Sequence, residues 1–303
     1  MAKRPRALSM RLGIAVTALS LAAAGCAGSS SAAGGDDKTI TIGVIPGWTD
    51  ETGTAALLEN VLEAKGYTVK ITKLSDAAPM YTALGNGDID LISSAWPERT
   101  HKAYMDKYGA KIEDIGTYYN DAGLFLAVPT YSDTKSLADL SSHASEFGGK
   151  ITGIEPGAGL TKTTQDAVMP AYGLDGKFKL VTSSTTAMLT ELKKATTAKK
   201  PIVVTLWKPY WANQAFPVRP LEDPKGAFGQ PEGLHTLARD GFSEDFPQVA
   251  EMIKNFKLDD AQYGSLEDTV VNEFGEGKEP EAVKAWLTKN PTYAPALEKY
   301  LTK

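Results

Sequence analysis

The sequence predicts an α/β protein of two lobes, each a sheet flanked by helices, with a ligand-binding cleft between them. Three observations support this fold class. The chain has 303 residues, which is more than a single hydrophobic core usually supports. A strand–helix–strand–helix–strand pattern occurs twice, and this pattern is typical of parallel sheets. An aromatic residue ends a strand in each half, and ligands bind at the carboxyl ends of strands in open α/β sheets.

The first repeat begins with β-branched residues bounded by a Pro-Gly pair, which predict a strand. Its first helix carries Leu57, Leu58, Val61 and Leu62 on one face and stops at Gly66. The predicted elements are strand Thr39–Ile45, helix Thr52–Lys65, strand Tyr67–Leu74, helix Pro79–Asn86 and strand Ile89–Ser93.

A long apolar strand, Gly116–Pro129, is expected to cross to the second lobe. The elements predicted there are helix Ser136–Leu140, strand Ile151–Glu155, a helix from the turn at 156–161 to about Tyr172, strand Phe178–Ser183, helix Thr185–Ala198 and strand Pro201–Leu206. After Val218 the chain should cross back and be helical, at Phe246–Phe256, Leu266–Phe274, Pro280–Leu287 and Tyr293–Leu301. We therefore assign residues 39–126 and 226–303 to lobe 1, and residues 127–225 to lobe 2.

The N-terminus is typical of an export signal. Basic residues precede the apolar run Leu12–Ala24, which is too short to span a bilayer. The chain's one cysteine, Cys26, follows at the expected cleavage site, and Ala23-Ala24-Gly25-Cys26 resembles a bacterial lipobox. We expect a lipoprotein signal peptide at 1–25, lipid attachment at Cys26 to the outer face of the cell membrane, and a flexible tether at 26–38. A plain secretory signal with an incidental cysteine is the alternative.

The composition argues against several classes of function. The net charge is −5 and no basic block follows the N-terminus, so nucleic acid is not an expected partner. The three histidines show no paired spacing, and HExxH and CxxC motifs do not occur, so we expect no metal site. A GxSxG motif does not occur either, and no cysteine follows Cys26. We therefore expect no catalytic residue and no cofactor.

Three of the five tryptophans, Trp48, Trp96 and Trp207, lie at the ends of predicted strands. If they converge from two lobes, their faces form an aromatic cage, and each ring attracts a cation by roughly 0.5–2 kcal/mol when water is excluded. A quaternary ammonium is the expected guest because it donates no hydrogen bond and its methyl groups match π faces. We assign the other two tryptophans, Trp211 and Trp286, to packing. Individually, each of the first three could also be a core residue.

A second feature points to an anion. The turn Gly157–Thr161 opens a predicted helix, and free N–H groups at helix starts bind anions. His101 lies five residues after Trp96 and offers an imidazole. Cage, turn and histidine together specify a zwitterion with a trimethylammonium and a carboxylate. The sequence leaves open whether His101 donates as a neutral tautomer or as a cation.

Five segments resemble, in order, the glycine betaine-binding proteins of osmoprotectant ABC importers. They are 47–51 (GWTDE), 94–101 (SAWPERTH), 153–159 (GIEPGAG), 202–211 (IVVTLWKPYW) and 221–226 (LEDPKG). The resemblance implies a type II periplasmic-binding-protein fold that closes on its ligand, with an ABC permease and ATPase as partners. It also implies a site in which the ammonium is boxed by three tryptophans and the carboxylate is held by a histidine and backbone N–H groups: Trp48, Trp96, Trp207, His101, Gly159 and Leu160. The chain departs from the family pattern at Thr49, Leu206 and Tyr210, and the departures at Thr49 and Leu206 leave open which betaine is preferred.

Two other functions are compatible with the sequence. One is a surface hydrolase acting on choline esters or cell-wall material, with Glu98 or Asp50 working with His101. The missing nucleophile and metal patterns count against it. The other is an adhesin or structural lipoprotein with no small ligand, which would need no cage.

Overall fold

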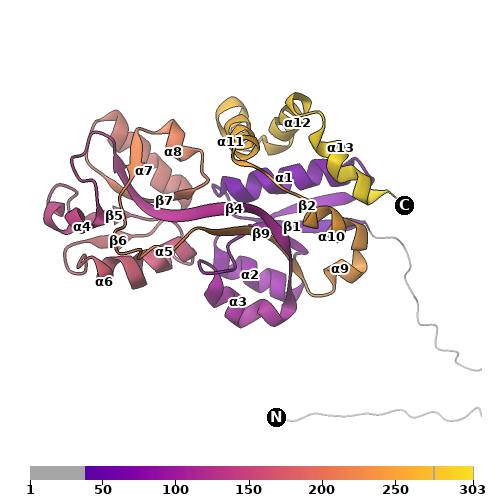
Figure 1. Cartoon of the computed structure of the whole chain (residues 1–303), viewed down its shortest axis with the longest axis horizontal. Helices are drawn as coiled ribbons and strands as arrows, with labels where there is room; N and C mark the ends of the chain where they lie inside the picture. The colour runs from indigo at the N-terminus through magenta and orange to yellow at the C-terminus, as the bar shows by residue number, and fades with distance from the viewer. Residues whose placement is uncertain (1–37, 276, 303) are drawn as a thin grey trace, which may run out of the picture. The chain divides into compact units, whose positions relative to one another are not determined.

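The computed structural model describes residues 38–275 and 277–302. The predicted signal peptide, Cys26 and residues 27–37 of the predicted tether lie outside the described residues. Within the described part, the strands follow the order β2-β1-β3-β9-β4-β7-β5-β6, and β8 pairs with β4. Helices lie on both faces of these strands (Figure 1). This is the two-lobed α/β architecture that the sequence predicts.

The first lobe is built on parallel strands, as predicted. Strand β1 (Thr39–Val44) pairs in parallel with β2 (Thr68–Lys73) on one side and with β3 (Leu91–Ala95) on the other. The connecting helices are α1 (Thr49–Glu63) and α2 (Ala77–Asn86). A further helix, α3 (Lys102–Tyr108), follows the segment that carries Trp96 and His101.

Helix α1 begins three residues earlier than its hydrophobic pattern predicts. Trp48 occupies the N-cap position, and Asp50 and Glu51 lie in the first turn. Carboxylates are stabilised there by the helix dipole. The early start buries both acids, with exposed fractions of 2% and 0%, and places Asp50 beside the cleft.

Strand β4 (Ile112–Pro129) runs through both lobes. It pairs with β9 (Glu232–Arg239) as far as Ala122 and with β7 (Val203–Lys208) from Gly123 onward. The expectation that the chain is helical after its return to lobe 1 is therefore wrong for β9. This strand lies between β3 and β4, antiparallel to both, and seven of its eight residues are buried. A strand covered on both faces lacks the apolar–polar alternation by which strands are identified in sequences.

The second lobe also has a parallel sheet. Strand β5 (Lys150–Thr152) pairs with β6 (Lys179–Val181) and with β7, and β8 (Val218–Pro220) pairs with β4. Its helices are α4 (Leu137–Leu140), α5 (Gly159–Thr163), α6 (Met169–Ala171), α7 (Thr185–Thr197) and α8 (Ala212–Ala215). A π-helical segment, Thr164–Val168, joins α5 to α6.

The C-terminal helices return to lobe 1, and the last three of them pack beside α1 (Figure 1). They are α9 (Phe242–Asp245), α10 (Pro247–Lys254), α11 (Asp260–Asp268) with its π-helical extension Thr269–Phe274, α12 (Glu279–Lys289) and α13 (Tyr293–Glu298). Short 3₁₀ turns lie at Gly109–Lys111, Ser141–His143 and Lys299–Leu301. Helix α11 begins before the predicted residue because Asp259 and Gln262 form a capping box.

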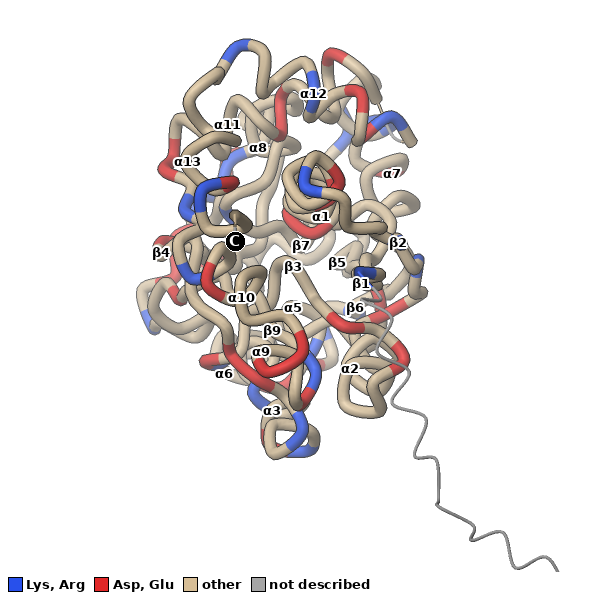
Figure 2. The backbone as a smooth tube through the Cα atoms, turned by 90° about the vertical axis from the view of Figure 1, so that its right-hand side faces the viewer, with Lys and Arg blue, Asp and Glu red and all other residues tan. Residues whose placement is uncertain are grey.

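A further sequence expectation concerns the burial of Trp286. Trp286 is fully buried, as predicted for a packing residue. Among the described residues, none of the helices has the length and apolar character needed to cross a bilayer. Figure 2 shows basic and acidic residues interspersed over the outer helices, which is the usual pattern of a solvated surface.

Candidate ligand-binding site

The six residues predicted to contact the ligand line one cavity between the lobes. Lobe 1 contributes Trp48, Trp96 and His101, and lobe 2 contributes Gly159, Leu160 and Trp207. The same cavity is lined by Asp50, Thr100, Leu124, Ile154 and Ala158. Segments that are far apart in the sequence therefore meet in the arrangement that the sequence predicts.

Each tryptophan of the cavity stands where a strand or helix meets the cleft. Trp48 caps α1, Trp96 follows β3 directly, and Trp207 is the penultimate residue of β7. The ring centroids of Trp48 and Trp207 are 6.5 Å apart and their planes are inclined at 56°. One cation can therefore lie within the roughly 6 Å of both centroids that cation–π attraction requires. Tyr210 stacks on Trp207 at 3.9 Å and supports this ring from behind.

The orientation of Trp48 is set by residues of the opposite lobe. Its indole Nε1 donates to Glu155 Oε2 at 3.0 Å and to Thr185 Oγ1 at 3.2 Å. Glu155 is itself held by the Thr185 backbone N–H, which donates to Oε1 at 2.7 Å. The two bonds from Trp48 link the loop after β1 to the loop after β5 and the start of α7. They join the two lobes, whereas the bond between Thr185 and Glu155 lies within lobe 2.

His101 is neutral and its tautomer follows from its contacts. Burial lowers the pKa of His101 to about 3, because a desolvated imidazolium is unfavourable. The Trp96 backbone N–H donates to Nδ1 at 3.3 Å, and the Tyr81 hydroxyl lies 2.9 Å from the same nitrogen. Nδ1 is therefore an acceptor, and Nε2 carries the ring's proton. The alternative left open by the sequence is thus decided in favour of a neutral Nε2–H donor.

The glycine turn is a second place where lobe 2 touches lobe 1. Ala158 caps α5, so the N–H groups of Gly159 and Leu160 belong to the first turn, where helices leave donors unpaired. The Gly157 N–H donates to Asp76 Oδ2 at 2.8 Å, and the Tyr104 hydroxyl donates to the Gly157 carbonyl at 2.6 Å. A Cβ atom on Gly159 would lie 2.2 Å from the Thr100 carbonyl oxygen. Only glycine permits this approach of the two backbones.

Asp50 is a cavity residue that the sequence analysis does not assign to the ligand. Its Oδ2 accepts from Ser94 Oγ at 2.8 Å and from Trp96 Nε1 at 3.5 Å, whereas Oδ1 has no hydrogen-bond partner in the described part of the chain. Burial raises the pKa of Asp50 to about 6, so the carboxyl is mostly ionised at pH 7. A buried carboxylate oxygen without a partner favours a positively charged guest. The sequence feature that identifies Asp50 as a cavity residue is its position two residues after Trp48, at the start of a helix.

Two more buried acids lie near the start of α1 but do not line the cavity. Burial, and next the charge of Asp50, raise the pKa of Glu51 well above its usual range. Burial raises the pKa of Glu267 to about 8, and its Oε1 accepts from Thr49 Oγ1 at 2.5 Å. Of these three acids, Asp50 is the one whose carboxyl faces the cavity.

The contacts of Glu98 and His101 do not support a hydrolase. Glu98 Oε1 accepts from the Gly233 N–H at 3.2 Å and lies 3.3 Å from His235 Nε2. In the described structure, neither Glu98 nor Asp50 hydrogen-bonds to His101, whose Nδ1 faces Tyr81 instead. Residues 38–275 and 277–302 also contain no group of three or more His, Cys, Asp or Glu residues placed to hold a metal ion.

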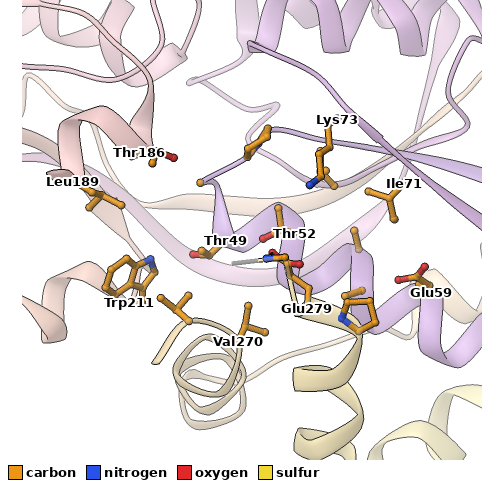
Figure 3. A pocket seen from close by; sticks show the side chains of 18 residues that line it. Thr49, Thr52, Glu59, Ile71, Lys73, Thr186, Leu189, Trp211, Val270 and Glu279 are labelled. Atoms are coloured by element: carbon orange, nitrogen blue, oxygen red, sulfur yellow. Dashed lines mark hydrogen bonds between the residues drawn. The ribbon is translucent and has the colours of Figure 1, made fainter. Parts of the chain in front are cut away.

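A larger cavity of about 310 Å³ lies on the other side of the segment from Pro46 to Thr49. Figure 3 shows Thr49, Trp211 and Val270 around it, with Glu279 nearby. Successive residues of the segment face different cavities, since Gly47 and Thr49 line this one and Trp48 and Asp50 line the other. The larger cavity contains none of the six predicted ligand residues, so the smaller one is the candidate site.

The chain resembles known proteins in both sequence and structure. Residues 38–289 match the family described as the substrate-binding domain of ABC-type glycine betaine transport systems. The chain is 40% identical over 144 residues to the glycine betaine/carnitine transport binding protein GbuC of Listeria monocytogenes, and the match covers 46% of each chain, about half the length of that relative.

Two solved structures extend the likeness over most of the chain. One is lactococcal OpuAC in its closed conformation with glycine betaine, with a TM-score of 0.78 and 28% identity, covering 88% of this chain and 100% of that one. The other is an ABC-transporter choline-binding protein in complex with choline, with a TM-score of 0.76 and 27% identity, covering 88% of this chain and 99% of that one.

Proposed function

The chain belongs to the family of substrate-binding domains of ABC-type glycine betaine transport systems, and we propose that it captures a quaternary ammonium osmoprotectant between its lobes. Outside the cytoplasm, it then delivers this ligand to the permease of an ABC importer, whose ATPase subunit drives uptake. The observation that carries the proposal is the meeting, in one cavity, of three tryptophans from two lobes with a neutral histidine and the first N–H groups of α5. The relatives that bind glycine betaine, carnitine or choline support the same class of ligand.

The proposed pose places the ammonium among Trp48, Trp96 and Trp207. The ionised carboxylate of Asp50 adds a negative charge at this end of the cavity. The carboxylate of a betaine points the other way, toward His101 Nε2–H and the N–H groups of Gly159 and Leu160, which the helix dipole favours for an anion. The carboxylate of a zwitterion would thus accept hydrogen bonds from both lobes.

Capture is expected to coincide with closure of the lobes. The bonds from Trp48 to Glu155 and from Gly157 to Asp76 both join lobe 1 to lobe 2. A ligand that contacts both lobes stabilises the closed form by its difference in affinity for the two states. We divide the lobes at residues 126/127 and 225/226, and the first of these boundaries lies close to where β4 exchanges β9 for β7. Binding involves no covalent step, so the protein should not turn its ligand over.

Anchoring completes the proposal. Cys26 is proposed to carry a lipid, and residues 27–37 to tether the binding domain to the outer face of the membrane. Incorporation of labelled palmitate into the wild-type chain but not into Cys26→Ser would be the expected result. Equal labelling of both chains would contradict it.

Isothermal titration calorimetry tests the binding function directly. The ligands are glycine betaine, proline betaine, carnitine and choline, and 3,3-dimethylbutanoate serves as an uncharged-carbon analogue of glycine betaine. We expect at least one of the quaternary ammonium ligands to bind, and the analogue to bind at least tenfold more weakly because it lacks the cation. Failure of all four to bind would refute the function.

The same titration separates the two ends of the site. His101→Ala should weaken the carboxylate-bearing betaines more than choline, because choline has no carboxylate for Nε2–H to reach. An equal loss for both kinds of ligand would remove His101 from the carboxylate end.

A further inference from the structure

Glu232 is a buried carboxylate beside the binding cavity, although it does not line it. It is the first residue of β9, at the point where the chain returns from lobe 2, and 4% of its surface is exposed. Burying a carboxylate is costly unless donors surround it. The donors around Glu232 are backbone N–H groups and a hydroxyl rather than a Lys or Arg side chain.

All of these donors belong to the loop that joins Trp96 to α3. The Arg99 N–H donates to Oε2 at 3.0 Å, and the Thr100 N–H donates to Oε1 at 3.3 Å. The Thr100 hydroxyl also donates to Oε1. In return, Glu98 of the same loop accepts from the Gly233 N–H at 3.2 Å. The loop and the start of β9 are therefore tied to each other in both directions.

This loop carries the end of the site that faces a ligand carboxylate. Thr100 and His101 both line the cavity. The Thr100 carbonyl is also the surface against which Gly159 of lobe 2 lies. A shift of Thr100 would therefore move the His101 donor and the place where the glycine turn closes.

Two of the three cage tryptophans are held by contacts elsewhere. Trp48 is fixed by Glu155 and Thr185, and Trp207 by its stack with Tyr210. None of these contacts involves Glu232 or the loop it binds, although Trp48 also stacks on His101 of that loop at 6.1 Å and Trp96 is hydrogen-bonded to His101. Removing the Glu232 carboxylate should thus disturb the carboxylate end of the site more than the rings of Trp48 and Trp207.

We propose that Glu232 is a positioning residue for the carboxylate-binding end of the site, acting through Thr100 and His101. It fixes the two N–H groups of Arg99 and Thr100 and so sets the position from which the Nε2–H of His101 reaches the ligand. The inference rests on the proposed betaine-binding function, since it concerns how the ligand's carboxylate is recognised. It adds a link between this recognition and β9, the strand that begins where the chain crosses back between the lobes.

The test compares Glu232→Ala and Glu232→Gln with a matched control, Glu113→Gln. Glu113 lies on β4 and accepts from the Ser243 backbone N–H through its two oxygens, at 3.4 and 3.2 Å, on a part of lobe 1 that does not line the cavity. Affinities for glycine betaine and choline are measured by calorimetry. Amide hydrogen exchange at Arg99 and Thr100 is measured without ligand by NMR.

We expect Glu232→Ala to lower glycine betaine affinity about tenfold or more and choline affinity less than threefold, because charge-assisted hydrogen bonds are lost at one end only. Exchange at Arg99 and Thr100 should become at least tenfold faster. Glu232→Gln should recover part of the lost affinity and part of the protection from exchange, because its amide oxygen still accepts hydrogen bonds. Glu113→Gln should change neither the affinities nor the exchange rates.

Equal losses for the two ligands would overturn the inference and reduce Glu232 to a structural residue. Unchanged exchange at Arg99 and Thr100 in Glu232→Ala would overturn it as well, whichever ligand the wild type prefers. Failure of the wild type to bind any betaine or choline is a different result, because it contradicts the proposed function. If Glu232→Ala does not fold, Glu232→Gln is scored by the same two measurements, with an expected betaine loss of about threefold.

Discussion

Replacing Asp50 with asparagine should stabilise the ligand-free protein and lower its affinity for a cationic ligand. Burial raises the pKa of Asp50 from 3.8 to about 6. One pKa unit corresponds to about 1.4 kcal/mol, so holding this carboxylate ionised in the folded protein costs about 3 kcal/mol above pH 6. The folded state binds the proton more tightly than the unfolded state. The contribution of Asp50 to stability is therefore most favourable below pH 3.8 and is lost as the pH rises to about 6.

Asparagine removes this cost but keeps an oxygen for the Ser94 hydroxyl. We expect Asp50→Asn to raise the free energy of unfolding at pH 7.5 by about 1–3 kcal/mol, and by less than about 1 kcal/mol at pH 4, where the wild-type carboxyl is already protonated. Urea denaturation at the two pH values measures this difference. Asp88→Asn, an exposed position in the α2–β3 turn, controls for simple loss of a negative charge.

The same substitution should weaken the binding of choline. A cation at about 5 Å from the carboxylate gains about 3 kcal/mol at an effective dielectric constant near 20, so the loss should lie between about tenfold and a hundredfold. In the wild type, choline affinity should fall about tenfold from pH 7 to pH 5, because the ionised fraction of Asp50 falls from about 0.9 to about 0.1. Asp50→Asn should show no such slope. Equal stability of the two proteins at pH 7.5, with the same pH slope in choline binding, would refute this account of Asp50.

Three further perturbations probe the cage, the closure and strand β9. Trp96→Ala should cost about 1–3 kcal/mol of binding free energy from lost cation–π attraction and lost burial; unchanged affinity by calorimetry would remove Trp96 from the cage. Gly159→Ala should lower ligand affinity at least tenfold with little effect on the free energy of unfolding, because its Cβ would lie 2.2 Å from the Thr100 carbonyl oxygen and oppose closure of the lobes. Small-angle scattering detects closure as ligand-induced compaction, and compaction that persists in this variant would contradict the prediction. Burial works against protonation of His235, but its hydrogen bonds with Asp114 and Glu98 outweigh it and raise its pKa. Its contribution to stability should be fully present below pH 6.5 and lost as the pH rises through the folded-state pKa. His235→Gln should accordingly lower the melting temperature more at pH 5.5 than at pH 8.5, and an effect independent of pH would count against the ion pairs.

The cavity-lining residues predicted from the sequence were those with a local signal. A tryptophan at the end of a β-branched run, or a glycine-rich turn before an amphipathic helix, can be recognised without knowing what lies across the cleft. Two similar repeats then imply that such ends face each other. The structure places all six predicted ligand residues around one cavity.

The residues that the sequence did not reveal depend on distant partners. Strand β9 is buried on both sides by β3 and β4, so its residues need not alternate in polarity. Asp50 and Glu232 look like ordinary surface acids in a sequence that has 37 acidic residues. Their importance comes from burial and from donors at Ser94, Arg99 and Thr100, which only the folded chain brings near them.

The position of β9 also determines when lobe 1 can be completed during synthesis. Residues 39–95 supply three of its strands, but β3 keeps an open edge until residues 232–239 insert between β3 and β4. The whole of lobe 2 is made in the interval. An N-terminal fragment therefore cannot close this sheet, and its exposed strand edge is a site for mispairing until the last quarter of the chain arrives. The order of the strands in the sheet thus makes the two lobes dependent on each other during synthesis as well as in the folded protein.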